Sequence, residues 1–297
     1  MRRLTEAILI VNTRSNHGEE QFVAAKDRLC EFGLPTSQAF GLEHVGAVKS
    51  KVREAIAGGV RLVIVGGGDG TLNGVANLFV GTKATLGVLP LGTGNQFARD
   101  LGIAPTVEAA CNVLVDGHVS TVDMGTVGGG YFLNVATVGL STLIAEGLNE
   151  EEKRKLGRVA YAFATARAML RVRPFRVALT MPEGRCEVDA MQIVIGNGRF
   201  HAGPFPVGPK ASIEDGKLTA YVVASRNRWG LIHYALSLPG GHQAALSEVH
   251  MFTTTEILLE TRPMRRITVD GEILYKTPMR FGVAHKALSV MTPVAFT

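Results

Sequence analysis

Short apolar runs alternate with stretches of helical periodicity over the first 119 residues. The apolar runs are continuous, which is typical of strands buried on both faces, and they lie at 7–11, 36–40, 61–65 and 85–89. Apolar residues at helical spacing predict helices over 22–32 and 45–56, which end at Gly33 and Gly58. This alternation predicts an α/β domain with a mostly parallel, doubly wound sheet.

From residue 120 onward the pattern changes to closely spaced strand-like runs. The first two, at 121–127 and 131–137, flank a glycine turn. A charged segment at 150–155 opens a predicted helix that reaches Leu170, and another helix is predicted over 229–238. The other runs lie at 175–180, 186–195, 217–224, 249–260, 265–270 and 279–283. They predict an antiparallel β-sandwich.

These patterns predict two domains, an α/β domain over residues 1–119 and an all-β sandwich over residues 120–286. We expect the chain end, 287–297, to pack back on the first domain. A length of 297 residues and a hydrophobic content of 46% are sufficient for two medium-sized cores.

Charge and cysteine content narrow the function classes. The net charge of +5 is too small to indicate nucleic-acid binding, and it suits an enzyme that meets anionic phosphates or an anionic membrane surface. Three cysteines far apart predict no disulfide framework or zinc site and favour a cytoplasmic location. No apolar run reaches ~18 residues, so we expect no transmembrane helix and at most peripheral binding at the inner face of the membrane. The oligomeric state is left open, a homodimer included.

The segment from Val65 to Gly74 carries the clearest candidate chemistry. Three glycines follow a buried strand and precede a predicted helix over 72–79. A glycine turn between a strand and a helix start brings backbone N–H groups and the positive end of a helix dipole to one point, which suits a phosphate. We expect Thr71 to cap the helix or to bond a phosphate oxygen. Asp69 would handle Mg²⁺ or take a proton, since a bare carboxylate repels a polyphosphate; a tight turn with a capping Asp is the alternative.

Two further polar loops, at 12–18 and 90–102, also follow predicted strands. The carboxyl ends of parallel strands meet at one edge of a sheet, which is where doubly wound folds bind ligands. We therefore expect all three loops to gather at one edge.

Five motifs, taken in order along the chain, resemble the diacylglycerol kinase catalytic domain family, which includes bacterial diacylglycerol kinases, sphingosine kinases and bacterial YegS-like lipid kinases. The motifs are Gly66-Gly67-Gly68-Asp69-Gly70-Thr71, Pro90-Leu91-Gly92-Thr93-Gly94-Asn95-Gln96-Phe97-Ala98-Arg99, Ile195-Gly196-Asn197-Gly198-Arg199, the run 209–218, and Asp270-Gly271-Glu272. One such motif is weak evidence. Five in order, spanning nearly the whole chain, are strong.

The resemblance implies ATP-dependent phosphorylation of a lipid hydroxyl, with a nucleotide domain like that of NAD kinases and phosphofructokinases. The loops at 12–16, 67–74 and 92–95 would then contact ATP. The candidate ATP-binding residues are Asn12, Thr13, Arg14, Ser15, Asn16, Gly67, Gly68, Asp69, Gly70, Thr71, Leu72, Asn73, Gly74, Gly92, Thr93 and Asn95.

A Mg²⁺ site and the catalytic carboxylates follow from the same resemblance. Asp215 matches an aspartate at a structural Mg²⁺ site, with oxygens from Ser212 and Lys217; an ordinary turn is the alternative. For catalysis, a carboxylate must accept the proton of the lipid hydroxyl. We expect Asp270 and Glu272 to face the same side of an extended strand, with Glu272 as proton acceptor and Asp270 as its partner or a Mg²⁺ ligand. The two roles are interchangeable on sequence alone, and an Asp-Gly hairpin turn is the alternative.

Three departures from the family pattern keep other functions in view. Gly74 stands where many relatives carry an acidic residue, Ser212 where they often have Asp, and no Thr stands near Gly41. These features allow a non-catalytic lipid- or nucleotide-binding protein. An NAD kinase is a further alternative, but its Asn-Glu pair and its Thr-Gly-Ser-Thr-like stretch are absent from the sequence.

The sequence indicates less about the lipid acceptor. The Gly/Pro-rich loop 199–208, which contains His201, is a candidate lining for an acyl chain. The acceptor is expected to be diacylglycerol, with a sphingoid base or phosphatidylglycerol as alternatives. A basic cluster could meet anionic headgroups at the membrane surface, or simply be a solvated helix face; it consists of Arg167, Arg171, Arg173 and Arg176.

Overall fold

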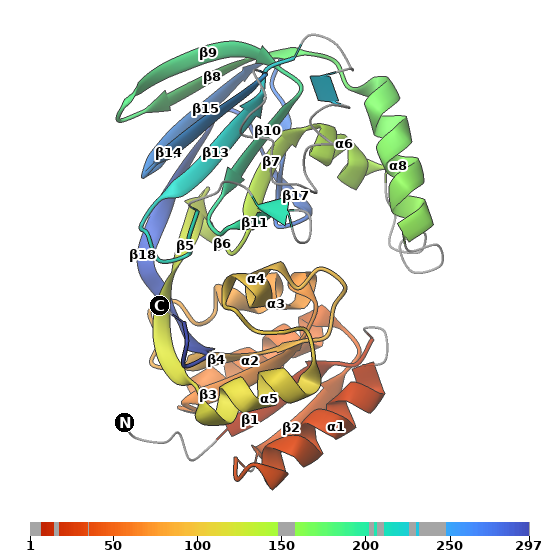
Figure 1. Cartoon of the computed structure of the whole chain (residues 1–297), viewed down its shortest axis with the longest axis vertical. Coiled ribbons are helices and arrows are strands. Elements are labelled where there is room, and N and C mark those ends of the chain that lie inside the picture. Colours follow the sequence, from red (N-terminus) through yellow and green to blue (C-terminus); the bar gives the residue numbers. More distant parts are fainter. Residues whose placement is uncertain are drawn as a thin grey trace.

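The computed structural model describes residues 7–14, 18–34, 36–147, 158–201, 205–206, 211–225, 230–231 and 248–296. It confirms an N-terminal α/β half and a C-terminal β-sandwich half (Figure 1). The charged segment at 150–155 and most of the predicted helix at 229–238 lie outside the described residues, as do Ser15 and Asn16.

Four parallel strands form the N-terminal sheet, in the order β2-β1-β3-β4. The strands are β1 (Ala7–Asn12), β2 (Thr36–Leu42), β3 (Leu62–Gly67) and β4 (Thr85–Pro90). Helices α1 (Gly18–Glu31) and α5 (Val107–Asp116) pack together on one face, and α2 (Val45–Ala57) and α3 (Asp69–Ala76) on the other. The short helix α4 (Gln96–Asp100) lies beyond the end of β4. This is the predicted doubly wound arrangement.

The apolar pattern explains this half. Every residue of β1, β3 and β4 is buried, as continuous hydrophobic runs require when helices cover both faces. Helix α1 buries Ala25 and Leu29, and α2 buries Val48 and Val52, at the spacing of one helix face.

The long strand β18 (Met279–Thr292) joins the two halves in one mixed sheet. Near its end, Val290 pairs in parallel with Leu86 of β4, and near its start it pairs antiparallel with β15 (Glu256–Arg262). Along most of its length it pairs antiparallel with β5 (His118–Val127), which in turn pairs with β6 (Gly130–Phe132). The sheet continues through β8 (Phe175–Met181) and β9 (Gly184–Ala190).

A second, antiparallel sheet packs against this one to form the sandwich (Figure 1). Its order is β14-β13-β10-β7-β16-β17, with β7 (Val135–Gly139), β10 (Gln192–Gly196), β13 (Leu218–Val223), β14 (Val249–Thr254), β16 (Arg266–Val269) and β17 (Glu272–Lys276). Phe132 and Phe281 meet edge to face in the core between the sheets. A small hairpin of β11 (Phe200–His201) and β12 (Phe205–Pro206) lies apart.

Three of the predicted strand runs each cover two strands that lie in different sheets. The run 186–195 is β9 and β10, the run 249–260 is β14 and β15, and the run 131–137 is β6 and β7. A chain that crosses from one layer of a sandwich to the other keeps its hydrophobic pattern, so the crossing leaves little trace in the sequence.

Two helices cover the outer face of the second sheet. Helix α6 (Leu140–Glu146), which the sequence pattern missed, packs against α8 (Arg158–Arg171). Leu140, Ile144, Ala164 and Ala168 form an apolar layer there with the sheet residue Tyr221. Neither these helices nor any other in the described part of the chain has the length and apolar character needed to cross a bilayer.

Candidate functional site

The loops after β1, β3 and β4 meet at one edge of the N-terminal sheet, as predicted. The side-chain amide of Asn12 donates a 2.9 Å hydrogen bond to Oγ1 of Thr71, which joins the first loop to the second. The second and third loops touch through backbone: a Cβ on Gly92 would lie 2.5 Å from the Cα of Gly68. Only glycine permits this approach. The Asn12–Thr71 contact lies between the ends of β1 and β3, where the strand order reverses, which is the usual ligand position in a doubly wound sheet.

Helix α3 begins at Asp69, three residues earlier than the sequence pattern indicates. Gly68 is its N-cap residue and supplies no side-chain cap. The expectation that Thr71 caps the helix was therefore wrong: Thr71 is buried and its hydroxyl accepts from Asn12. The first backbone N–H groups of α3 are consequently left without a side-chain cap, and such groups are the usual partners of a phosphate.

The Asp69 carboxylate holds the third loop. Its Oδ1 accepts a 2.7 Å hydrogen bond from the backbone N–H of Gln96, and the carboxylate also accepts from the N–H groups of Asn95 and Phe97. A negative charge at the start of α4 interacts favourably with that helix dipole. Burial nevertheless raises the pKa of Asp69 above its usual range. These contacts explain an acidic residue beside a phosphate loop without requiring it to bind a metal.

Other predicted ATP contacts lie around this edge. The backbone N–H of Arg14 bonds Oδ1 of Asn12 at 3.2 Å, and its guanidinium lies 3.2 Å from Nδ1 of His44. Thr93 is exposed at the tip of the third loop. Gly74 faces helix α2, because a Cβ there would lie 2.9 Å from Cγ1 of Val45. An acidic residue at position 74 would therefore have to displace α2 side chains.

The two halves of the protein meet at Asn73. Its side-chain amide donates to the backbone carbonyl of Asp270 at 3.4 Å, and its carbonyl oxygen accepts from the amide of Asn134 at 3.2 Å. Asn73 was predicted as an ATP contact. The structure shows that it links the second loop, 67–74, called the phosphate loop below for its predicted role, to the Asp270-Gly271-Glu272 motif, 197 residues further along the chain.

The expectation that Asp270 and Glu272 share one side of a strand was wrong. Val269 pairs with Glu272, so Asp270 and Gly271 form a two-residue hairpin turn. Both have positive φ, +47° and +91°, as the favoured hairpin turn requires. The turn directs the two carboxylates into different surroundings.

Asp270 is committed to the fold. Its carboxylate accepts backbone N–H hydrogen bonds from Leu133, Asn134 and Val135 at 2.8, 2.9 and 3.0 Å. These donors lower its pKa, but burial outweighs them and raises it to about 6. Glu272, in contrast, is exposed at the start of β17. Of the two, Glu272 has the carboxylate that a substrate can reach.

The predicted Mg²⁺ loop is largely closed upon itself. The Asp215 carboxylate accepts from the backbone N–H of Lys217 at 2.9 Å and from that of Ser212. The Ser212 hydroxyl accepts from the N–H of Glu214 at 3.3 Å. Among the described residues, no three His, Cys, Asp or Glu side chains cluster as a metal site would require. A metal here would be held by the carboxylate of Asp215, by backbone oxygens and by water, so its role as a Mg²⁺ site stays a prediction.

Asp123, a residue that sequence reasoning missed, holds this loop in place. Its fully buried carboxylate accepts from the backbone N–H groups of Gly216 and Lys286 at 2.6 and 2.7 Å, and lies 2.7 Å from Nδ1 of His285. Burial, together with the charge of Asp123, raises the pKa of Asp215. The signal that could have identified it is an aspartate within the apolar part of strand β5.

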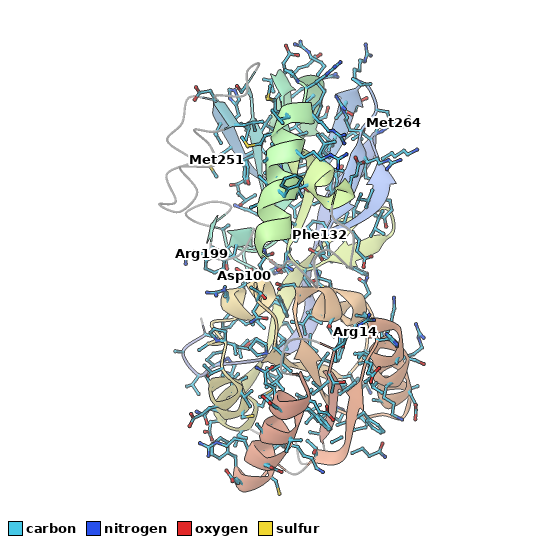
Figure 2. The ribbon with its side chains drawn as sticks, turned by 90° about the vertical axis from the view of Figure 1, so that its right-hand side faces the viewer. Arg14, Asp100, Phe132, Arg199, Met251 and Met264 are labelled. Atoms are coloured by element: carbon cyan, nitrogen blue, oxygen red, sulfur yellow. The ribbon has the colours of Figure 1, made fainter. Side chains whose placement is uncertain are left out.

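Asp100 and Arg199 lie side by side where α4 meets the C-terminal half (Figure 2). The backbone N–H of Arg199 donates to Oδ1 of Asp100 at 2.8 Å. Oδ2 of Asp100 is buried and has no hydrogen-bond partner among the described residues. Burial raises the pKa of this carboxyl to about 7. A cavity of about 420 Å³ opens beside it, between Leu101, Ile213 and Phe296.

The raised pKa of Asp100 predicts a pH-dependent stability. The folded protein binds this proton more tightly than the unfolded chain, so the stabilisation is complete below pH 3.8 and is lost as pH rises through about 7. Chemical denaturation of wild type and Asp100→Asn should show the free energy of unfolding of wild type falling by a few kcal/mol relative to that of the variant as pH rises across this range. The expected change is about 1.4 kcal/mol per unit of pKa difference between the folded and unfolded states. Parallel pH profiles of the two proteins would contradict this assignment.

Family models match both halves of the chain. Residues 6–127 match the diacylglycerol kinase catalytic domain, and residues 134–292 match the YegS C-terminal NAD kinase beta sandwich-like domain. A Pseudomonas aeruginosa protein named "Probable lipid kinase YegS-like" is 30% identical over 97% of this chain and 95% of its own. A Staphylococcus saprophyticus protein named "Diacylglycerol kinase" is 26% identical over 90% of this chain and 88% of its own.

Solved structures agree with the fold. A crystal structure from Bacillus anthracis superposes with a TM-score of 0.85 at 25% identity, covering 100% of this chain and 98% of that one. Another, a diacylglycerol kinase from the same organism, gives a TM-score of 0.78 at 21% identity over 100% of both chains, a similarity that concerns the fold alone. With the phosphate loops, the hairpin motif and both domain matches in place, the chain belongs to the family of diacylglycerol kinase-like and YegS-like lipid kinases.

Proposed function

We propose that this lipid kinase transfers the γ-phosphoryl group of ATP to a lipid hydroxyl, with diacylglycerol as the expected acceptor. The observation that carries the proposal is the hydrogen bond from Asn73 to the carbonyl of Asp270, because it joins helix α3, which begins in the phosphate loop, to the hairpin that leads into the exposed Glu272. Phosphoryl transfer depends mainly on positioning and charge stabilisation, so this juxtaposition is its first requirement.

The phosphate loop would hold the ATP phosphates. The close contact between Gly68 and Gly92 would let a phosphate approach the backbone, and the start of α3, which has no side-chain cap, adds the positive end of a helix dipole. Asp69 keeps the third loop against the second. Its own charge is satisfied by backbone donors, which lessens its repulsion of a triphosphate.

Glu272 would accept the proton of the lipid hydroxyl as the new P–O bond forms. Its carboxylate is exposed, while the hairpin that carries it is fixed by Asp270. This division assigns proton transfer to Glu272 and positioning to Asp270.

Mg²⁺ would enter with ATP. In kinase sites this ion is held mainly by substrate phosphates, water and one or two carboxylates, and it neutralises phosphate charge. The roles of Ser212, Asp215 and Lys217 as metal ligands stay a prediction, and we derive no step through a metal at that loop.

The expected substrate is a membrane lipid, so we propose that the protein works as a peripheral protein at the cytoplasmic face of the membrane. A panel of acceptors tests the proposed reaction: diacylglycerol, a sphingoid base, phosphatidylglycerol and NAD, each in detergent micelles or buffer with labelled ATP and Mg²⁺. We expect label to enter diacylglycerol first. Transfer of label to NAD alone would establish an NAD kinase. No transfer to any acceptor would favour a non-catalytic lipid- or nucleotide-binding protein.

A further inference from the structure

A second hollow, which is lined by basic residues, lies on the C-terminal half, remote from the phosphate loop. It has a volume of about 250 Å³ and is formed by the end of α8 with the residues after it, by α6, and by the segment that leads into β16. Four of its lining residues are arginines, Arg171, Arg173, Arg265 and Arg266, against one acidic residue, Glu146. Figure 2 places the neighbouring Met264 far from the junction where Asp100 lies.

The positive charge of this hollow is mostly uncompensated. Arg266 forms an ion pair with Glu146 at 3.3 Å. The guanidinium of Arg265 lies 4.9 Å above the ring of Phe175, and its buried Nε has no hydrogen-bond partner in the described part of the chain. Within that same part, neither Arg171 nor Arg173 has a carboxylate within ion-pair distance. Three guanidinium groups thus line the hollow without a paired carboxylate among the described residues.

The basic cluster seen in the sequence divides here. Arg176 pairs with Glu187 at 3.1 Å and with Asp189 at 3.6 Å, so it belongs to the β8–β9 surface. Arg171 and Arg173 line the hollow and are joined there by arginines some ninety residues later. The fold therefore assembles a site that no local run of the sequence contains.

Large apolar side chains are exposed on the same elements. Phe163 and Leu170 of α8 are 76% and 69% exposed, and their seven-residue spacing places them on one face of the helix. Met264, which lines the hollow, is 63% exposed. A site for a free anion needs arginines only. Arginines beside projecting apolar side chains match a headgroup together with its acyl region.

We propose that this hollow binds the phosphate of an anionic phospholipid and so attaches the C-terminal half to the bilayer. Guanidinium groups suit this ligand because their planar donors bind phosphate oxygens in pairs and stay charged at all relevant pH values. Leu170 and Met264 would then enter the interfacial region. This lipid is a ligand distinct from the substrate, and its site is separate from the kinase site.

Vesicle flotation without ATP tests the proposal independently of the proposed reaction. Vesicles of phosphatidylcholine are compared with vesicles that also contain phosphatidylglycerol, using wild type, Arg171→Gln/Arg173→Gln, and a control that loses the same charge on α2, Lys49→Gln/Arg53→Gln. We expect wild type and control to float with the anionic vesicles. The α8 variant should bind them roughly tenfold more weakly, given the attraction of each basic residue to an anionic surface.

Three further measurements make each outcome decisive. Thermal denaturation shows whether the α8 variant is folded, and Met264→Ser, which keeps every charge, should also weaken flotation if the apolar contact is real. Inorganic phosphate is titrated against the wild type by NMR. Equal flotation of the α8 variant and the control overturns the proposal. So does saturable phosphate binding at Arg171 and Arg173 without any preference for anionic vesicles, because the ligand would then be a free anion.

Discussion

Glu272→Gln is expected to lower kcat for lipid phosphorylation by about 10²–10⁴-fold, the usual contribution of a general base. Glutamine keeps the size and hydrogen-bonding shape of the side chain but cannot take the hydroxyl proton. The KM for ATP should change little, because the phosphate loop is untouched. The melting temperature should also hold, because Glu272 is exposed and away from the core. Steady-state kinetics with diacylglycerol micelles, together with thermal denaturation, measure all three.

The matched control for this variant is Glu260→Gln, an equally conservative change on strand β15. It should leave kcat unaltered. If Glu272→Gln retained more than about a tenth of the wild-type kcat, proton transfer would have to be assigned to another group.

Asp270→Asn is expected to have the largest effect on stability, lowering the free energy of unfolding by about 2–4 kcal/mol. The native carboxylate accepts from three N–H donors, on both of its oxygens. In asparagine one oxygen becomes an NH₂ group, which must face an N–H donor inside a buried turn. The hairpin that carries Glu272 should loosen, so kcat should fall as well. Urea denaturation and kinetics on the same preparation measure both effects.

Asp27→Asn provides the comparison, since Asp27 is exposed on helix α1 and the change removes the same charge. Its unfolding free energy should stay within about 0.5 kcal/mol of wild type. An Asp270→Asn protein as stable as wild type would show that the three hydrogen bonds do not hold the turn.

Local pattern predicted most of the N-terminal half. Continuous apolar runs predict strands, and the glycine turns directly after them predict loops, so both signals are local in the sequence. The loops at 67–70 and 91–95 could therefore be placed at one edge of the sheet. The C-terminal half was harder, because a sandwich strand can change layers without changing its alternation, as happens at Met191 and Thr255. Helix α6 is only seven residues long and was lost among strand-like residues.

Side-chain roles were less predictable than positions. The motif Asp270-Gly271-Glu272 was found from the sequence, but its residues were assumed to be extended. Asp270 and Gly271 have positive φ instead. Asp69 was expected to handle Mg²⁺, to take a proton or to cap a turn, and its backbone partners at residues 95–97 were not foreseen. The hydrogen-bond partners of a buried carboxylate are determined by packing between distant segments, and the spacing of residues along the sequence does not reveal them. The arginine hollow is another case, since its members come from segments that approach only in the folded chain.

Strand β18 makes the two halves difficult to separate. The same fourteen residues pair with β15 of the sandwich at one end and with β4 of the N-terminal half at the other. The first family match ends at residue 127, at the end of strand β5. Most of β5 nevertheless pairs with β18, which lies far beyond that match in the sequence. A fragment cut there would expose two unpaired strand edges, which invite aggregation. The protein is thus better regarded as one cooperative folding unit, completed only when its last strand is in place.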